Sequence, residues 1–206
     1  MAINLVDPDF QYSIYLVQRE YARTGDETLG DLLTDILVDR SKCDNRSILQ
    51  IVLNESLLVA PKLTSVQVNT LSLIQLLSNM RFGGLADFAE LESIFARTQG
   101  LVGNISGLSE SGLLHLQYSG AMSINHIIKK DISRKVHETY KYLSDDTGYE
   151  DFTNAIKEGV PSLVKCIDMF NNHRMYRAEL TSVGTLIGLA NLKKIFSSID
   201  YSVWIN

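Results

Sequence analysis

Apolar residues recur at helical spacing through the first hundred positions of the chain. In residues 8–24 they fall at i, i+4, i+7 and i+11, which places them on one face of a helix. Proline is favoured in a first helical turn, and Pro8 stands at that point. The predicted inward face of this helix consists of Phe10, Ile14, Val17 and Tyr21.

Four more helices are predicted before residue 99. The second carries a broad apolar stripe over residues 29–37, and the third covers residues 46–59. The fourth begins at Thr64, because Thr64 and Gln67 have the spacing of a capping box, in which each side chain bonds the other residue's backbone N–H. The fifth covers residues 85–98.

The middle of the chain has a weaker pattern. Residues 100–120 contain five glycines, which predicts loops with one short helix at 109–119. Apolar residues at helical spacing then predict a long helix with a basic face over 124–143. Two further helices are predicted at 149–158 and 161–171.

The C-terminal region combines helix and strand patterns. A short strand is predicted at 175–180, and Thr181 is expected to cap a helix that continues to about residue 196. Tyr201, Val203 and Ile205 alternate as in a second strand, for which 175–180 is the available partner. The sequence therefore predicts a mainly α protein, a multi-helix bundle with a small C-terminal strand element.

We expect two helical subdomains, residues 1–99 and 121–206, joined by a glycine-rich connection at 100–120. A chain of 206 residues that is 45% hydrophobic and 21% charged is long enough to bury a core in this arrangement. No apolar run approaches the roughly 18 to 20 residues that a membrane-spanning helix needs, and the N-terminus lacks a signal-peptide pattern. Cys43 and Cys166 lie far apart and are expected to be reduced thiols, so we expect a cytoplasmic protein with no membrane partner.

Charge is distributed unevenly along the chain. Residues 1–60 carry five basic and ten acidic groups, whereas residues 161–206 carry a net charge of +2 within a total of −5. The acidic N-terminal part repels a phosphate backbone, so we expect no tight binding of nucleic acid. The acidic row of Asp31, Asp35 and Asp39 is interpreted as a solvated helix face. The alternative is that the three carboxylates share a cation.

The histidines do not form a recognisable metal site. His115, His126 and His137 are spaced by eleven residues, and the last two would share a face of the predicted 124–143 helix. At 1.5 Å per residue they would lie about 16 Å apart, which is too far for one metal ion. We therefore assign no metal ligand, no cofactor and no catalytic residue.

Glycines and cysteines also have structural explanations. Residues 100–107 lack the glycine spacing and the lysine of a phosphate-binding loop. Gly184 and Gly188, four residues apart in a predicted helix, indicate close helix packing. Cys43 lies beside a lysine that could lower the pKa of its thiol, but a surface cysteine at a helix end is the simpler interpretation. Cys166 fits a core position.

Nucleic-acid binding is an alternative that rests on two features. Residues 180–184, Leu-Thr-Ser-Val-Gly, resemble the strand-to-helix junction of winged-helix domains over about a dozen positions. A winged-helix-like fold used for protein contact is as compatible with this resemblance as one that reads DNA. The second feature is a group of basic residues in the predicted 124–143 helix, namely Lys129, Lys130, Arg134, Lys135 and Lys141.

Three pairs of segments carry a resemblance to a known family. They are residues 7–12 with 20–26, residues 49–55 with 60–64, and residues 180–184 with 202–205. These segments resemble an uncharacterised bacterial protein family that is known by locus-tag names. The resemblance implies an intracellular bacterial protein and longer relatives with a further N-terminal region, so that this chain corresponds to their C-terminal portion. It implies no activity and transfers no catalytic residue.

The sequence thus favours a non-enzymatic, intracellular protein-interaction or oligomerisation module, with a protein partner or a second copy of itself. We expect dimerisation through the apolar faces of the first two helices, at 10–21 and 29–37. The apolar C-terminal tail is expected to pack on its own chain. The alternatives are a winged-helix-like nucleic-acid-binding or regulatory domain and an unrecognised enzyme.

Overall fold

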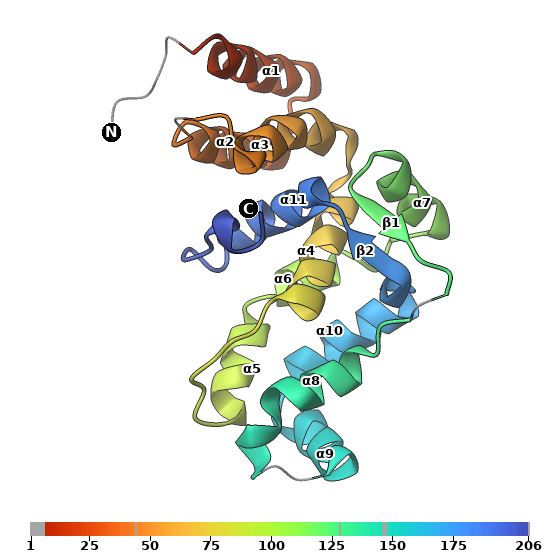
Figure 1. The fold of residues 1–206 in the computed structure, drawn as a ribbon. Helices are drawn as coiled ribbons and strands as arrows, with labels where there is room; N and C mark the ends of the chain where they lie inside the picture. Colours follow the sequence, from red (N-terminus) through yellow and green to blue (C-terminus); the bar gives the residue numbers. More distant parts are fainter. Residues whose placement is uncertain (1–6, 44, 128, 146–147, 206) are drawn as a thin grey trace.

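The computed structural model describes residues 7–43, 45–127, 129–145 and 148–205. Within these residues the chain forms eleven α-helices and a two-stranded antiparallel sheet (Figure 1). This confirms the predicted mainly α class with a small strand element. None of the described helices is both long enough and apolar enough to cross a membrane.

The first four helices follow the predicted segments closely. Thr64 and Gln67 form the predicted capping box, in which the Gln67 side chain accepts the Thr64 N–H at 3.0 Å. A 3-10 turn, η1 (Ala60–Lys62), precedes this helix. The four helices are α1 (Pro8–Thr24), α2 (Glu27–Arg40), α3 (Ile48–Val59) and α4 (Ser65–Asn79).

Shorter elements make up the rest of the chain. The predicted fifth helix begins at Phe88, three residues later than expected, with Asp87 as its N-cap. The predicted loop region 100–120 begins inside a helix. The helices are α5 (Phe88–Ala96), α6 (Gln99–Gly103), α7 (Glu110–Tyr118), α8 (Ile132–Tyr140), α9 (Tyr149–Gly159), α10 (Pro161–Asn172) and α11 (Ser182–Lys193). The strands are β1 (Met122–Ile124) and β2 (Ala178–Leu180), and the remaining 3-10 turns are η2 (Lys141–Ser144), η3 (Met175–Arg177) and η4 (Tyr201–Val203).

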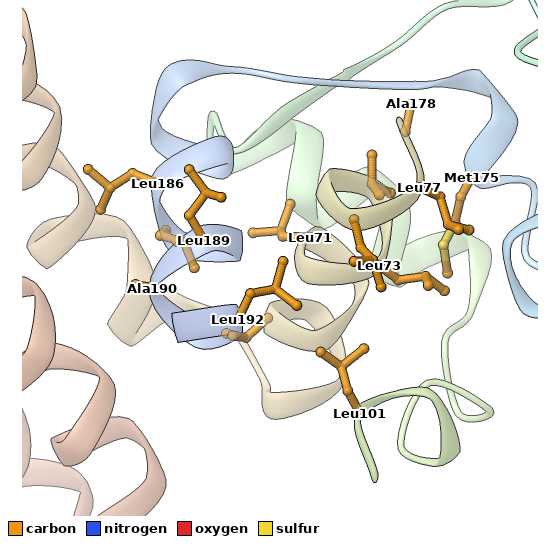
Figure 2. Close-up of a cluster of buried hydrophobic side chains, with 14 of the residues drawn as sticks. Leu71, Leu73, Leu77, Leu101, Met175, Ala178, Leu186, Leu189, Ala190 and Leu192 are labelled. Carbon is orange, nitrogen blue, oxygen red and sulfur yellow. The ribbon is translucent and has the colours of Figure 1, made fainter. Parts of the chain in front are cut away.

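Helices α4 and α11 cross at the centre of the molecule. Nine of the 12 residues of α11 are buried, so this helix has almost no solvent face. A Cβ atom at Gly184 would lie 1.8 Å from the Ala121 carbonyl oxygen, and one at Gly188 would lie 2.9 Å from the Leu71 carbonyl oxygen. The predicted close packing of two helices is therefore confirmed at Gly188, whereas Gly184 meets the backbone directly before β1. Figure 2 shows Leu189 beside Leu71 in the cluster that the two helices form.

The predicted long helix over 124–143 is wrong. Its first residue, Ile124, is instead the last residue of β1, which pairs antiparallel with β2. The pairing continues past the strand, because the Asn125 N–H donates to the Arg177 carbonyl oxygen at 2.7 Å. The helix α8 begins only after Asp131, whose carboxylate accepts the N–H of Arg134 at 2.9 Å and caps the helix. Pairing with β2, a strand far away in the same chain, therefore overrides the helical spacing of the isoleucines.

The predicted strand over 201–205 is also wrong, and β2 has β1 as its partner instead. The carboxylate of Asp200 accepts the N–H of Ser202 at 3.0 Å, and this local bond starts the 3-10 turn η4. The predicted strand at 175–180 becomes η3 followed by β2. Tyr201 and Ile205 are nevertheless buried against their own chain, as expected of the tail.

The inward face of α1 is rotated relative to the predicted one. Phe10 and Val17 are buried as predicted, but Ile14 is only half-buried and Tyr21 is exposed. The polar side chain of Ser13 takes an inward position, where its hydroxyl donates to the Asp9 carbonyl oxygen at 3.0 Å. Hydrophobicity alone therefore misplaced the face, because a hydrogen-bonded serine can be buried at little cost.

One core joins the residues of both predicted subdomains. Its buried side chains extend from Val17 to Ile205, and α11 packs against α2, α3 and α4. The stripe over residues 29–37, where dimerisation was expected, is part of this core, since Leu33 and Ile36 are fully buried. The stripe is thus already covered within the chain.

Candidate interaction face

The histidines and cysteines that the sequence singled out do not come together. His126 lies in the loop after β1, whereas His137 lies on α8 with its ring 5.1 Å from that of Phe152, so the predicted shared helix face is wrong. Cys166 is buried, and burial raises the pKa of its thiol to about 11. In the part of the chain that the structure describes, no three His, Cys, Asp or Glu side chains are placed to hold a metal ion.

The acidic row of α2 is not one solvated face. Asp31 is exposed, but Asp39 is buried and accepts hydrogen bonds from Lys42 Nζ at 2.5 Å and from Lys193 Nζ at 2.6 Å. Burial raises the pKa of Asp39, but the bonds from Lys193 and Lys42 outweigh it and hold the pKa below its ordinary value. Burial beside Asp39 raises the pKa of Tyr201. Asp39 therefore connects α2, α11 and the C-terminal turn.

A cleft of about 760 Å³ lies between the start of α1 and α3, above the buried guanidinium of Arg40. Arg40 donates to Asp7 Oδ2 at 3.0 Å, to Asp9 Oδ2 at 2.9 Å and to Asn54 Oδ1 at 2.9 Å. The bonds from Arg40 lower the pKa of Asp7. The polar groups at the base of the cleft thus bind one another and connect α1, α2 and α3, which is a structural role.

Two of the predicted basic residues hold the fold together. Lys130 Nζ donates to the Ala178 carbonyl oxygen at 2.8 Å, and Lys135 Nζ donates to the Ser78 carbonyl oxygen. Burial lowers the pKa of both lysines. Because their charged ends are directed to backbone atoms, Lys130 and Lys135 are poorly placed for a phosphate backbone, unlike the exposed Lys129.

The two most exposed large apolar side chains of the described residues lie at the end of α7 and in the loop that follows β1, and Leu114 lies on α7 as well. Ile127 is 92% exposed, Tyr118 is 88% exposed and Leu114 is 52% exposed. The Ile124 N–H donates to the Gln117 side chain at 2.9 Å, which holds the end of α7 against β1 (Figure 1). We call the surface formed by Leu114, Tyr118 and Ile127 the α7–β1 face.

Cations surround the α7–β1 face. Arg177 contacts the His126 ring, and Lys129 Nζ lies 5.9 Å from the centre of the Tyr176 ring. Arg174, further along, forms an ion pair of 3.5 Å with Glu110 at the start of α7. Apolar side chains of this exposure with a polar rim are typical of a surface that another molecule covers.

The sequence pattern does not predict the α7–β1 face, for a physical reason. The helix predicted over 124–143 would have made Ile127 one more residue of a continuous helix, whereas β1 and the loop after it direct the side chain to solvent. Leu114 and Tyr118 are four residues apart in the correctly predicted short helix, so they share one of its faces. That spacing is the one signal in the sequence for an exposed apolar pair on this helix. The opposite face packs on the core through Leu113 and Leu116, which are buried.

Comparison with known proteins agrees with the resemblance seen in the sequence. The sequence model of an uncharacterised family matches residues 3–151 and 146–205. No curated protein and no solved structure matches the chain. Since the two matched ranges together cover nearly all of the 206 residues, the chain belongs to this uncharacterised family.

Proposed function

We propose that this protein is a non-enzymatic interaction module that self-associates through the α7–β1 face. The observation that carries the proposal is the 92% exposure of Ile127 and the 88% exposure of Tyr118. The bond from the Ile124 N–H to the Gln117 side chain brings the end of α7 next to the strand that leads to Ile127. Burial of apolar surface is the main favourable term in protein association. The stripe over residues 29–37, where contact was expected, is already covered within the chain, so the α7–β1 face takes its place as a contact surface.

The cellular setting is part of the same proposal. Cys43 and Cys166 are not joined by a disulfide in the structure, which supports a reducing, cytoplasmic environment. The family resemblance supports a bacterial source and longer relatives, of which this chain would be the C-terminal portion. An interaction module fits such an arrangement, because it can act as one part of a larger assembly.

The winged-helix alternative is less well supported. The predicted junction forms, since β2 leads into α11 with Thr181 as the N-cap. A helix that reads DNA must enter the major groove, but nine of the 12 residues of α11 are buried. We therefore retain the expectation that the protein does not bind duplex DNA tightly.

Sedimentation velocity over a concentration series tests self-association. We expect the mass of the wild-type protein to rise above that of a monomer as the concentration approaches about 200 µM. The variant Tyr118→Ser/Ile127→Ser should remain monomeric, because it removes most of the exposed apolar area of the face. A matched control is Tyr142→Ser/Val203→Ser, which changes two residues that are 46% and 66% exposed elsewhere. A wild-type protein that stays monomeric throughout would refute the proposal.

A further inference from the structure

A second surface, between the N-terminal helices α1 and α2, lies apart from the α7–β1 face. A groove of about 410 Å³ lies between α1 and α2. Its floor includes Val17, Tyr21 and Gly30, and the Tyr21 ring lies directly over Gly30. A Cβ atom at Gly30 would lie 2.7 Å from Tyr21 Cδ2, so the glycine allows the ring to lie this close to α2. We call this surface the α1–α2 groove.

The rim of the α1–α2 groove is acidic. Glu27 and Asp31 are exposed, lie four residues apart on α2 and both line the groove. Among the described residues, neither carboxylate forms an ion pair or a side-chain hydrogen bond within the chain. Asp35 continues the row one turn further on and is half-buried. The groove therefore presents negative charge for which the chain supplies no counter-charge at that point.

The larger cleft between α1 and α3 lacks this property. Its carboxylates Asp7 and Asp9 already bind the buried guanidinium of Arg40, and its lining includes the cation Arg46 as well as Glu55. Those charges nearly cancel, so the cleft has no preference for a cationic partner. The α1–α2 groove is the acidic concavity with uncompensated charge.

The loop after β1 has the opposite chemistry. Ile127 projects into solvent with 92% of its surface exposed, next to His126 and with the exposed Lys129 two residues further on. Arg177, the last residue of η3 directly before β2, contacts His126 and adds a second cation. An apolar side chain flanked by two cations matches a groove of mixed lining that has Val17 and Tyr21 in its floor and two carboxylates on its rim.

We propose that Ile127 of one copy of this chain inserts into the α1–α2 groove of a second copy, with Lys129 and Arg177 facing Glu27 and Asp31. This inference rests on the proposed self-association and names the surfaces that meet. The two surfaces are different parts of the molecule, α1 and α2 at the top of Figure 1 and the loop after β1 at its right. The contact is thus head-to-tail, and successive copies extend into a chain or close into a ring.

Charge reversal on each surface tests the proposal. The basic-side variant is Lys129→Glu/Arg177→Glu, and the acid-side variant is Glu27→Lys/Asp31→Lys. Each variant places like charges opposite one another, so the association constant should fall about a hundredfold or more. An equimolar mixture should regain the association, because the unchanged groove of the first variant meets the unchanged loop of the second. The reversed surfaces of the two variants are also complementary.

A matched control separates local contacts from net charge. Lys157→Glu/Lys165→Glu changes the net charge by the same amount as the basic-side variant, at exposed positions of α9 and α10. This control should associate like the wild type. Raising the salt concentration from about 50 mM to about 500 mM should weaken the wild-type association, since the rim charges become screened.

The possible outcomes separate this inference from the proposed function. A wild-type protein that associates while both reversals leave its mass unchanged would retain the proposed function and refute the head-to-tail contact. Loss of association in one variant alone, without recovery on mixing, would also refute it. If the basic-side variant loses binding to a duplex DNA probe but keeps the wild-type mass, the loop is a nucleic-acid contact and the proposal is wrong.

Discussion

Helices α11 and α1 are held in the fold by different kinds of contact. Helix α11 buries nine of its 12 residues, and α1 buries five of its 17. Helix α11 is held by close backbone approach at Gly184 and Gly188, where no side chain intervenes. Helix α1 lies at the edge of the molecule and is held at its start by the ion and hydrogen-bond network of Arg40 (Figure 1).

The difference shows which part of the protein responds to which perturbation. Contacts between closely packed backbones depend on shape and are indifferent to pH and salt. The network at the start of α1 depends on charges that are partly exposed, since Asp9 keeps 53% of its side-chain surface. We therefore expect α1 to separate from the rest of the fold before the α4–α11 crossing opens.

The largest effect is expected from Gly184→Ala. The added Cβ would lie 1.8 Å from the Ala121 carbonyl oxygen, and a backbone atom cannot move aside as a flexible side chain can. We expect a loss of about 3 kcal/mol or more in the free energy of unfolding, measured by urea denaturation. The matched control is Gly100→Ala in α6, where a Cβ has nothing within 4 Å. Equal stability of the two variants would show that α11 approaches the Ala121 backbone less closely than the structure indicates.

The sequence predicted the interior well and the surface poorly. The start of α4 follows from the capping box at Thr64, and the close packing of α11 follows from two glycines four residues apart, although the sequence places these helices in different subdomains. Each of those signals is local, so the sequence can show it. The strand β1 depends on pairing with β2, which lies more than fifty residues later. Long-range pairing of this kind leaves no local signal, and the exposure of Ile127 follows from it.

A smaller effect is expected at the edge of the molecule from Arg40→Met. The change leaves Asp7 and Asp9 without their cation and removes one of the two donors to Asn54 Oδ1, the other being the Ser13 hydroxyl. Because the two carboxylates are partly exposed, we expect a loss of about 2 kcal/mol rather than the full cost of breaking a buried pair. Hydrogen exchange should show the loss mainly as faster exchange in α1. The control Arg46→Met changes an exposed arginine, and a similar loss there would contradict the role of Arg40.

The smallest effect, and the one that depends on pH, is expected from Asp39→Asn. Burial raises the pKa of Asp39, but hydrogen bonds from Lys193 and Lys42 outweigh it, so the folded-state pKa lies below the unfolded one. The charged form of Asp39 therefore stabilises the fold above the unfolded-state pKa, and this stabilisation is lost as the pH falls through the folded-state pKa. At neutral pH the substitution should cost about 1.5 kcal/mol, since it replaces two charge-assisted hydrogen bonds.

The difference between wild type and Asp39→Asn should shrink as the solution is acidified below the ordinary pKa of an aspartate, because Asp39 of the wild type then becomes neutral as well. Thermal unfolding measured across that range gives the difference directly. Asp31→Asn is the matched control, since Asp31 lies on the same helix but is exposed and has no ion pair among the described residues. A difference that stays constant with pH would show that Asp39 supports the C-terminal turn by its shape, and that charge plays no part in holding α2 to α11.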